Sequence, residues 1–242
     1  MSYILLYLLF IFLAKINSQE IFEKKLKKNY RILLISNMNT YPNKQGYQSK
    51  REVLYDILKK SKLFSEIKIV SLESINHFNE LLLSIYDCVI YDFLDWGSQI
   101  VNPAKEIENY IKNGGNIIVT HDHVFDGLSD LLGIKIMYKV TYHDKVKIIN
   151  FEHEIWNSYY NLNDWKSKPL KIALTHGNFL QGNEQTQRLM VSYDDFDDIY
   201  LSTRKIGMGN AIYWNAGHSM DITPQEKKLF INIIVWALKN NN

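Results

Sequence analysis

Three residues with acid–base or ligand-binding side chains follow one apolar run in the sequence. The segment 112–127, KNGGNIIVTHDHVFDG, places His121, Asp122 and His123 directly after residues typical of a buried strand. Histidine titrates near neutral pH, and a neighbouring carboxylate can orient its ring or stabilise its charged form. These residues could therefore transfer protons or bind a ligand.

Two further segments carry side chains suited to the same chemistry. In FLDWGSQI, a sugar ring could stack on Trp96 while Asp95 accepts hydrogen bonds from its hydroxyl groups. Trp96 could equally seal the edge of the core, as large aromatic residues often do. His218 follows a late strand-like run, NAIYWNAGHS. The candidate catalytic residues are His121, Asp122 and His218, and the candidate substrate contacts are Asp95, Trp96 and His123.

Other reactive residue types give weaker signals. Both His121 and His218 could simply bond backbone groups in loops. The single cysteine, Cys88, lies within the apolar run YDCVIYDF, where a thiol is usually a small core side chain. The acidic run YDDFDDIY lacks calcium-loop spacing and predicts a solvated turn. Seven scattered histidines form no metal motif, which leaves any metal or cofactor unassigned.

The elements that must position these residues alternate between strand and helix in the first half. Apolar runs bounded by turn residues predict strands at RILLIS, EIKIVSL, DCVIYDF and NIIVT. Helical spacing predicts helices over Gln48–Lys60, Asn76–Leu83 and Pro103–Lys112. Such alternation favours an open parallel sheet with helices on both faces. Ligands bind such sheets at the carboxyl ends of the strands, where the candidate residues fall.

The second half is richer in strands. Strand-like runs occur at IKIMYKV, KVKIIN, LKIALT, RLMVSY, DIYLSTRK and NAIYWNAG, before an amphipathic helix over Pro224–Lys239. We expect a mixed or antiparallel extension of the same sheet. It includes a hairpin that turns at Gly207–Gly209. No repeat or composition shift marks a second domain, so one domain over residues 31–240 is predicted.

Composition and the N-terminal segment limit the class of protein. The formal net charge of +2 does not indicate a basic surface that would bind nucleic acid, so a small-molecule ligand is the favoured partner. The apolar run Tyr3–Ala14 is shorter than a membrane span and predicts a signal peptide over residues 1–18, followed by a basic leader over 19–30. A secreted protein, or one in the secretory lumen, is therefore expected, with an uncleaved signal anchor as the alternative.

Four segments carry a resemblance to a known family. These are YDCVIYD, IENYIKNGGNIIVTHDHVFDGLSDLLG, GMGNAIYWNAGHS and the closing FINIIVWAL. Together they resemble the ThuA-like (trehalose-utilisation) branch of the class I glutamine amidotransferase-like superfamily, over roughly Arg31 to Leu238. The resemblance implies a flavodoxin-like three-layer α/β sandwich with a mainly parallel central sheet.

The resemblance also limits the chemistry. In true amidotransferases the elbow after the corresponding strand carries a cysteine, whereas His121 matches that position here. Glutamine hydrolysis through a thioester is therefore not expected, because a histidine does not replace an activated thiolate. Two hypotheses follow: a domain that binds or processes a carbohydrate-type metabolite, or a catalytically silent interaction domain of the same fold. The sequence leaves substrate, reaction and oligomeric state open.

Overall fold

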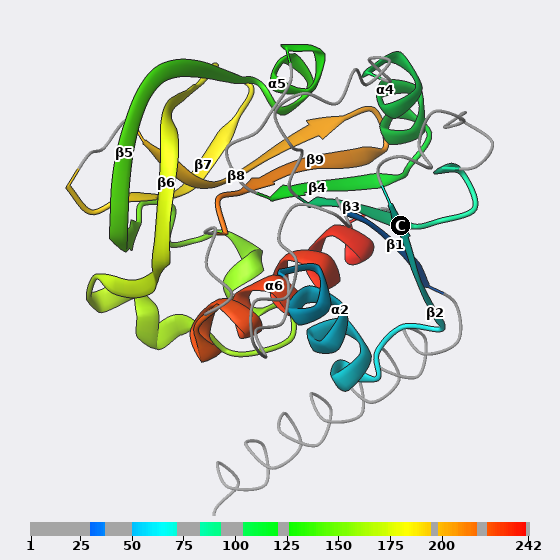
Figure 1. Cartoon of the computed structure of the whole chain (residues 1–242), viewed down its shortest axis with the longest axis horizontal. Helices are drawn as coiled ribbons and strands as arrows, with labels where there is room; N and C mark the ends of the chain where they lie inside the picture. Colours follow the sequence, from blue (N-terminus) through cyan, green and yellow to red (C-terminus); the bar gives the residue numbers. More distant parts are fainter. Residues whose placement is uncertain are drawn as a thin grey trace, which may run out of the picture.

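A nine-stranded mixed sheet organises the chain in this computed structural model (Figure 1). The structure describes residues 30–36, 50–71, 83–92, 104–120, 126–194, 198–216 and 222–240. The predicted signal peptide, nearly all of the basic leader and most of the predicted helix Asn76–Leu83 lie outside these residues. Among the described residues, no helix combines the length and apolar character needed to cross a membrane.

One half of the sheet is parallel. Its strands are, in spatial order, β2 (Glu66–Ser71), β1 (Arg31–Ser36), β3 (Cys88–Asp92), β4 (Asn116–Thr120) and β9 (Gly209–Trp214). The first four match the strands predicted from apolar runs. This order is that of a flavodoxin-like sheet, in which the chain reverses direction across the sheet between the first and third strands.

The other half extends the sheet with antiparallel strands. It continues from β9 through β8 (Ile199–Ile206), β7 (Gln187–Ser192), β5 (Ile134–Ile148) and β6 (Leu170–Gly182). The predicted hairpin is confirmed, because Ile206 pairs with Gly209 across its turn. The prediction of separate strands at 134–140 and 145–150 was wrong. A single strand, β5, spans both runs, with register shifts where the alternation of side chains breaks.

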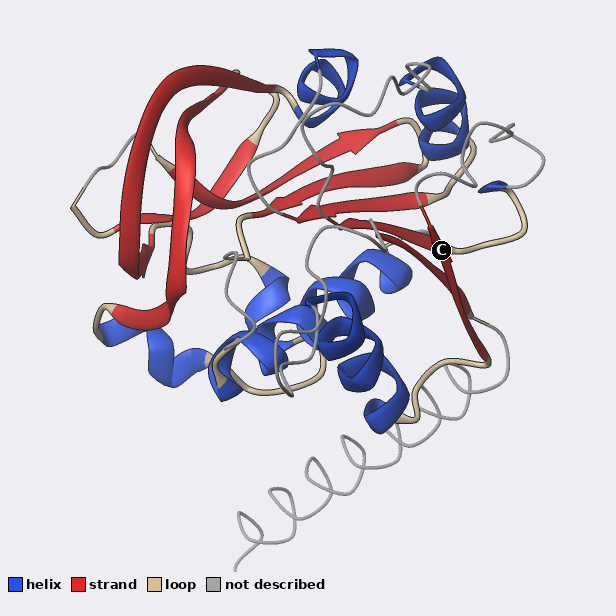
Figure 2. Ribbon diagram, in the orientation of Figure 1, coloured by secondary structure: helices blue, strands red, loops and turns tan. Residues whose placement is uncertain are grey.

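Helices cover both faces of the parallel half, as the sandwich prediction requires (Figures 1 and 2). α2 (Lys50–Ser61) and α6 (Pro224–Lys239) lie on one face, and α4 (Ala104–Lys112) and α5 (Asp126–Leu132) lie on the other. Short 3-10 helices, η2 (Glu154–Asn157) and η3 (Asn163–Ser167), follow β5. Contacts between η2 and α6 join the antiparallel extension to the first face.

Alternate strand residues supply two separate cores. In β1, Ile32 and Leu34 join the core under α2 and α6, whereas Leu33 and Ile35 join the core under α4 and α5. Successive side chains of a strand point to opposite faces, so a strand buried on both faces must be apolar throughout. This explains the continuous apolar runs RILLIS and NIIVT.

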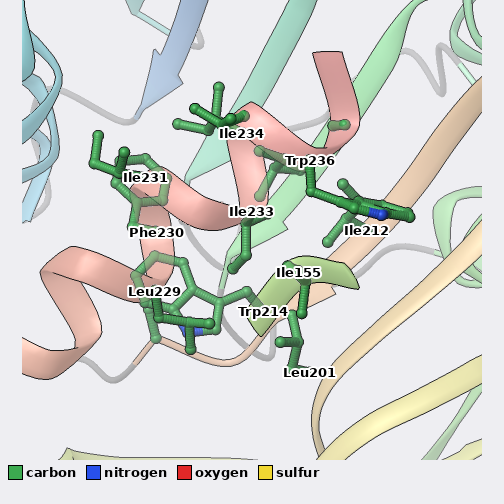
Figure 3. Close-up of a cluster of buried hydrophobic side chains, with 14 of the residues drawn as sticks. Ile155, Leu201, Ile212, Trp214, Leu229, Phe230, Ile231, Ile233, Ile234 and Trp236 are labelled. Carbon is green, nitrogen blue, oxygen red and sulfur yellow. The ribbon is translucent and has the colours of Figure 1, made fainter. Parts of the chain in front are cut away.

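Helix α6 is buried on nearly all sides and anchors the larger core. Figure 3 shows its apolar residues against Ile212 and Trp214 of β9, Leu201 of β8 and Ile155 of η2. The ring of Trp214 stacks on Phe230 with centroids 5.2 Å apart. The helix begins with a complete capping box, in which Thr223 and Glu226 bond each other's backbone N–H groups.

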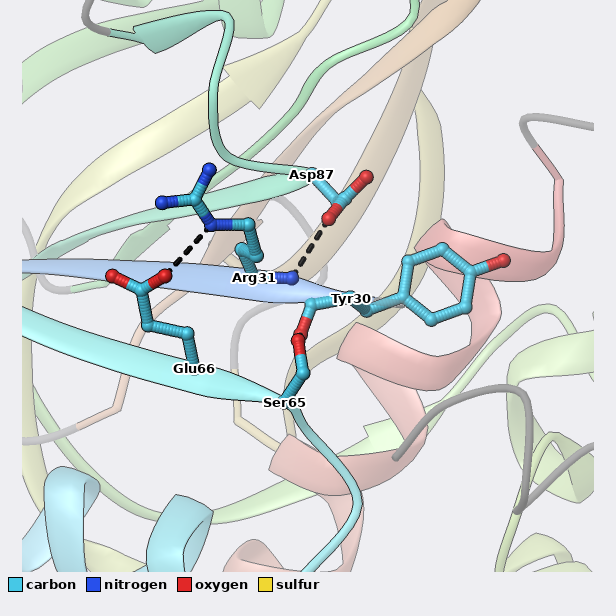
Figure 4. A network of polar contacts seen from close by, with 5 residues as sticks. All are labelled: Tyr30, Arg31, Ser65, Glu66 and Asp87. Atoms are coloured by element: carbon cyan, nitrogen blue, oxygen red, sulfur yellow. Dashed lines mark hydrogen bonds and ion pairs between the residues drawn. The ribbon is translucent and has the colours of Figure 1, made fainter. Parts of the chain in front are cut away.

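The amino ends of the parallel strands are closed by bonds to the backbone. Figure 4 shows Asp87 accepting the N–H of Arg31 at 2.7 Å, and Glu66 accepting the guanidinium of Arg31 at 2.8 Å. Asn116 donates to the carbonyl of Asp87 and accepts from Asn210. We call this region, from Arg31 through Asp87 and Asn116 to Gly209, the amino edge.

Candidate functional site

Four of the parallel strands end at the same level, at the end of the sheet opposite the amino edge. Ser36 of β1 pairs in register with Asp92 of β3, Asp92 with Thr120 of β4, and Thr120 with Trp214 of β9. Each of these four residues lies two positions after a residue of the core under α2 and α6. Because side chains alternate between the two faces along a strand, all four side chains point to that face. We call the ends of these four strands the carboxyl edge.

Hydrogen bonds join three of these residues into a polar tier of Ser36, Asp92 and Thr120. The hydroxyl of Ser36 donates to one oxygen of Asp92 at 3.0 Å, and the hydroxyl of Thr120 donates to the other at 2.5 Å. Asp92 is only 1% exposed. The two hydrogen bonds fix the position of the Asp92 side chain between β1 and β4. The ends of these three strands are therefore joined by a buried network of side-chain hydrogen bonds.

The sheet topology makes this edge the expected ligand site. In a flavodoxin-like strand order, the connections leave in opposite directions after the first and third strands, which opens a crevice at their carboxyl ends. The bond between Ser36 and Asp92 lies at this switch point. The candidate residues of the sequence analysis follow β3, β4 and β9, and all three described strands end just before them.

The predicted site residues themselves lie outside the described residues. The set comprises Asp95, Trp96, His121, Asp122, His123 and His218. The structure establishes the strand ends that precede them: His121 follows Thr120 directly, Asp95 lies three positions after Asp92, and His218 lies four after Trp214. His121 and His218 thus follow neighbouring, in-register strand ends.

The chain beyond β9 is anchored on both sides of residues 217–221. Thr175 of β6 donates a hydrogen bond to the side chain of Asn215 at 3.0 Å, and both residues are buried. After the segment, the carboxylate of Glu226 accepts the N–H groups of Thr223 and Ala173, each at 2.9 Å. These contacts tie β6 and the start of α6 to the carboxyl end of β9.

Glu226 also accepts a bond from a buried tyrosine. The hydroxyl of Tyr200 donates to its second oxygen at 2.8 Å. Burial, and next the charge of Glu226, raises the pKa of Tyr200 well above its usual value. Tyr200 therefore acts as a fixed hydrogen-bond donor. Because Glu226 is 2% exposed and bonded at both oxygens, it serves the packing of α6 onto the sheet.

The sequence analysis missed a buried Ser–His–Asp arrangement in the extension. Ser192 of β7 lies 2.8 Å from Nδ1 of His143 on β5, and Nε2 of His143 contacts a carboxylate oxygen of Asp198. The imidazole of His143 therefore bridges the hydroxyl of Ser192 and the carboxyl group of Asp198. The prediction that the whole acidic run forms a solvated turn is wrong for Asp198, which is 2% exposed. The contact with the buried side chain of His143 compensates for the cost of removing the carboxyl group of Asp198 from water.

This arrangement is better suited to structure than to nucleophilic catalysis. Ser192 is 2% exposed. Its own N–H donates to the carbonyl of Asp198, and the N–H of Tyr193 donates to the carbonyl of Lys145. Those two amides are therefore occupied and cannot stabilise an oxyanion beside Ser192. We interpret the cluster as a link between β5, β7 and β8.

Two other expectations concern cysteine and metal. Cys88 is fully buried in β3, and burial raises the pKa of its thiol, which confirms the prediction of a core side chain. Among the described residues, no group of three or more His, Cys, Asp or Glu side chains could hold a metal ion.

Comparison with known proteins identifies the fold. No protein-family model matches the chain, and no curated protein matches it with statistical significance. A solved cytoplasmic protein from Salmonella typhimurium is similar at a TM-score of 0.62 and 13% identity, over 85% of this chain and 98% of that one. A ThuA-like protein from Bacteroides uniformis is similar at a TM-score of 0.61 and 15% identity, over 86% and 91%. The chain has a ThuA-like fold.

The same ThuA-like fold occurs as part of larger proteins. A cold-adapted β-galactosidase from Rahnella is similar at a TM-score of 0.57 and 13% identity, over 87% of this chain but only 31% of the enzyme. The ThuA-like chain thus corresponds to less than a third of that protein. At these identities the likeness shows the fold alone.

Proposed function

We propose that this ThuA-like domain binds or processes a small carbohydrate-type metabolite at the carboxyl edge of its sheet. The observation that carries the proposal is the register of Ser36, Asp92, Thr120 and Trp214, which ends four strands at one level. All six candidate site residues follow three of these ends within four positions. The flavodoxin-like switch point lies at the same level.

The roles assigned to the candidate residues follow from their chemistry. His121 and His218 would exchange protons with the ligand, and Asp122 would orient one imidazole. Trp96 would stack on the apolar face of a sugar ring, while Asp95 and His123 would bond its hydroxyl groups. Glutamine hydrolysis is not part of the proposal, because Cys88 is a core residue of β3 and His121 follows β4.

One observation favours a second candidate, an interaction domain without catalysis. The fold forms about 31% of the Rahnella β-galactosidase, and thus occurs beside other parts of a larger chain. A domain of this kind would keep the sheet and both hydrophobic cores, but its carboxyl edge would not catalyse a reaction. The two candidates differ in whether the isolated protein binds a sugar.

A ligand screen on the mature chain distinguishes them. A ligand that binds only the native state raises the melting temperature in proportion to the logarithm of its concentration above Kd. We expect shifts with sugars, and loss of those shifts in His121→Ala and His218→Ala. Asp87→Asn, at the amino edge, is the matched control and should retain them. Unchanged sugar affinity in both histidine variants contradicts the site, and turnover abolished by His121→Ala contradicts the silent domain.

We also propose that the protein enters the secretory pathway and loses residues 1–18. The support is the apolar run Tyr3–Ala14, which is followed by polar residues around Ser18. Intact-mass measurement on protein from the native host should give a chain that begins near Gln19. A soluble cytosolic product that retains Met1 contradicts this proposal.

A further inference from the structure

The segment that connects β5 to β6 packs against α6 between the two strands. It covers residues 149–169 and contains η2 and η3, and we call it the strap. Figure 1 shows it beside α6, and η2 contacts that helix. Ile155 and Trp156 of η2 are fully buried in the core under α2 and α6, so apolar contact holds part of the strap in place.

Hydrogen bonds from α6 to the backbone of the strap hold the rest. The side chain of Asn232 donates to the carbonyls of Ile155 and Tyr160 and accepts the N–H of Tyr160 at 2.7 Å. Lys239 donates to the carbonyl of Ser158 at 2.6 Å. An amide side chain does not titrate, so the three bonds of Asn232 do not depend on pH.

One contact between the strap and α6 does depend on pH, and it is made by His153. Its Nδ1 accepts the N–H of Ile155 at 3.3 Å and caps η2, and its ring centroid lies 4.8 Å from that of Trp236 on α6. The acceptor role requires a neutral imidazole, because both nitrogens of the protonated ring carry hydrogen. Burial lowers the pKa of His153 to about 4. The closed strap therefore fits the neutral ring.

The charged groups around this ring do not offset its burial. The strap contributes Glu152 and Glu154, which are exposed, and α6 contributes Lys239. The charge of Glu154 raises the pKa of both His153 and Lys239, but burial has the larger effect on each of them. A proton on His153 thus has no buried carboxylate among these groups to stabilise it.

We propose that the strap is an acid-sensitive clasp, in which protonation of His153 releases η2 from α6 while the sheet stays folded. Release would expose the imidazole to water, where burial no longer opposes its charge, and would break no bond between strands. The released form takes up the proton first, so closure is fully stable above pH 6.5 and weakens as the pH falls towards 4. Water would then reach Ile155 and Trp156. The clasp is independent of the ligand proposed for the carboxyl edge.

Hydrogen–deuterium exchange of the protein, followed by mass spectrometry of its peptides, tests the clasp. After correction for intrinsic rates, amides of residues 153–162 should exchange at least about tenfold faster at pH 4.5 than at pH 7. The two pKa values, 4 and 6.5, allow up to about sixtyfold, and the partial exposure of the ring reduces this. Amides of β1 and β4 should change by less than about twofold, because their bonds do not involve His153.

The matched control is His153→Asn, which keeps an N-cap acceptor but does not titrate. Its strap should accelerate by less than about threefold over the same pH range. Equal acceleration in the variant and the wild type would assign the response to another group and overturn the proposal. A wild-type strap that does not accelerate, or that accelerates no more than the sheet, would also overturn it. These two wild-type outcomes decide the question even if His153→Asn fails to fold.

Discussion

The two edges of the parallel half both carry acidic side chains, but the partners of those side chains differ. At the amino edge, Asp87 accepts the backbone N–H of Arg31, and its own carbonyl accepts from Asn116. At the carboxyl edge, Asp92 accepts the side-chain hydroxyls of Ser36 and Thr120. The acidic side chain at the amino edge thus holds the backbone of a strand, whereas the acidic side chain at the carboxyl edge holds side chains of the two neighbouring strands.

The difference also appears in burial. Asp87 is half-buried beside the exposed pair of Arg31 and Glu66, while Asp92 is fully buried. The amino edge can therefore be understood as a structural closure. The carboxyl edge combines a buried polar network with the switch point of the fold, where ligands bind in sheets of this kind.

The largest effect is expected where the carboxyl edge is supported by α6. Glu226→Ala removes the acceptor for Tyr200, Ala173 and Thr223 and destroys the capping box. Each buried donor left without an acceptor costs about 1–3 kcal/mol, so we expect a loss of at least about 3 kcal/mol in the free energy of unfolding, measured by denaturant titration. A loss below about 1 kcal/mol would show that the hydrogen bonds of Glu226 do not stabilise the packing of α6 against the carboxyl edge.

A smaller loss is expected from crowding the amino edge. A Cβ at Gly209 would overlap the carbonyl oxygens of Gly115 and Ile111, which belong to backbone that cannot rotate away. Gly209→Ala should therefore cost about 1–3 kcal/mol of stability without changing sugar affinity. Its neighbour Met208 is exposed, and Met208→Ala should cost less than about 0.5 kcal/mol. Equal losses in the two variants would rule out tight packing at this edge.

His153 lies outside both edges and makes the stability of the fold sensitive to acid. Its contribution must be removed before the effects of the two edges on the pH dependence of stability can be compared. Burial lowers the pKa of His153 to about 4 from 6.5, and its Nδ1 accepts the N–H of Ile155. The unfolded chain takes up the proton first, so this contribution is complete above pH 6.5 and is lost as the pH falls towards 4. His153→Asn keeps an N-cap acceptor, and its melting temperature should fall less than that of wild type between pH 7 and 5. Identical slopes would contradict the lowered pKa.

The smallest effect is expected at Asp87. Burial raises its pKa above 3.8, despite the opposing bond from Arg31. A raised carboxyl pKa stabilises the fold at low pH, and that stability declines as the pH rises from 3.8 through the folded value. Asp87→Asn keeps an oxygen for the N–H of Arg31, so we expect a change below about 1 kcal/mol at pH 7 and a flatter profile above pH 4. A large loss at pH 7 would mean that the carboxylate charge itself closes the edge.

The sequence predicted the parallel half well because its local signals agree with its environment. The interior residues of RILLIS and NIIVT are apolar because both faces of β1 and β4 are covered, and the carboxyl ends of these segments mark the carboxyl edge. The extension was harder to predict. In β5, Tyr142 is exposed and His143 buried beside a register shift, which breaks the alternation that defines a strand.

The buried side-chain clusters could not be predicted from spacing. His143 lies on β5, Ser192 on β7 and Asp198 directly before β8, and only the pairing of β7 with β5 and β8 brings them together. The tier of Ser36, Asp92 and Thr120 depends in the same way on register. Asp92 lies in the predicted strand DCVIYDF, but nothing in that local sequence indicates that two hydroxyl groups would bond its side chain.

A crystal structure of the protein with a bound unphosphorylated sugar tests the central claim most directly. The account predicts that the sugar lies over the carboxyl ends of β1, β3 and β4, against residues that directly follow Ser36, Asp92 and Thr120. A sugar bound at the amino edge, or on the antiparallel extension away from Trp214, would contradict the account.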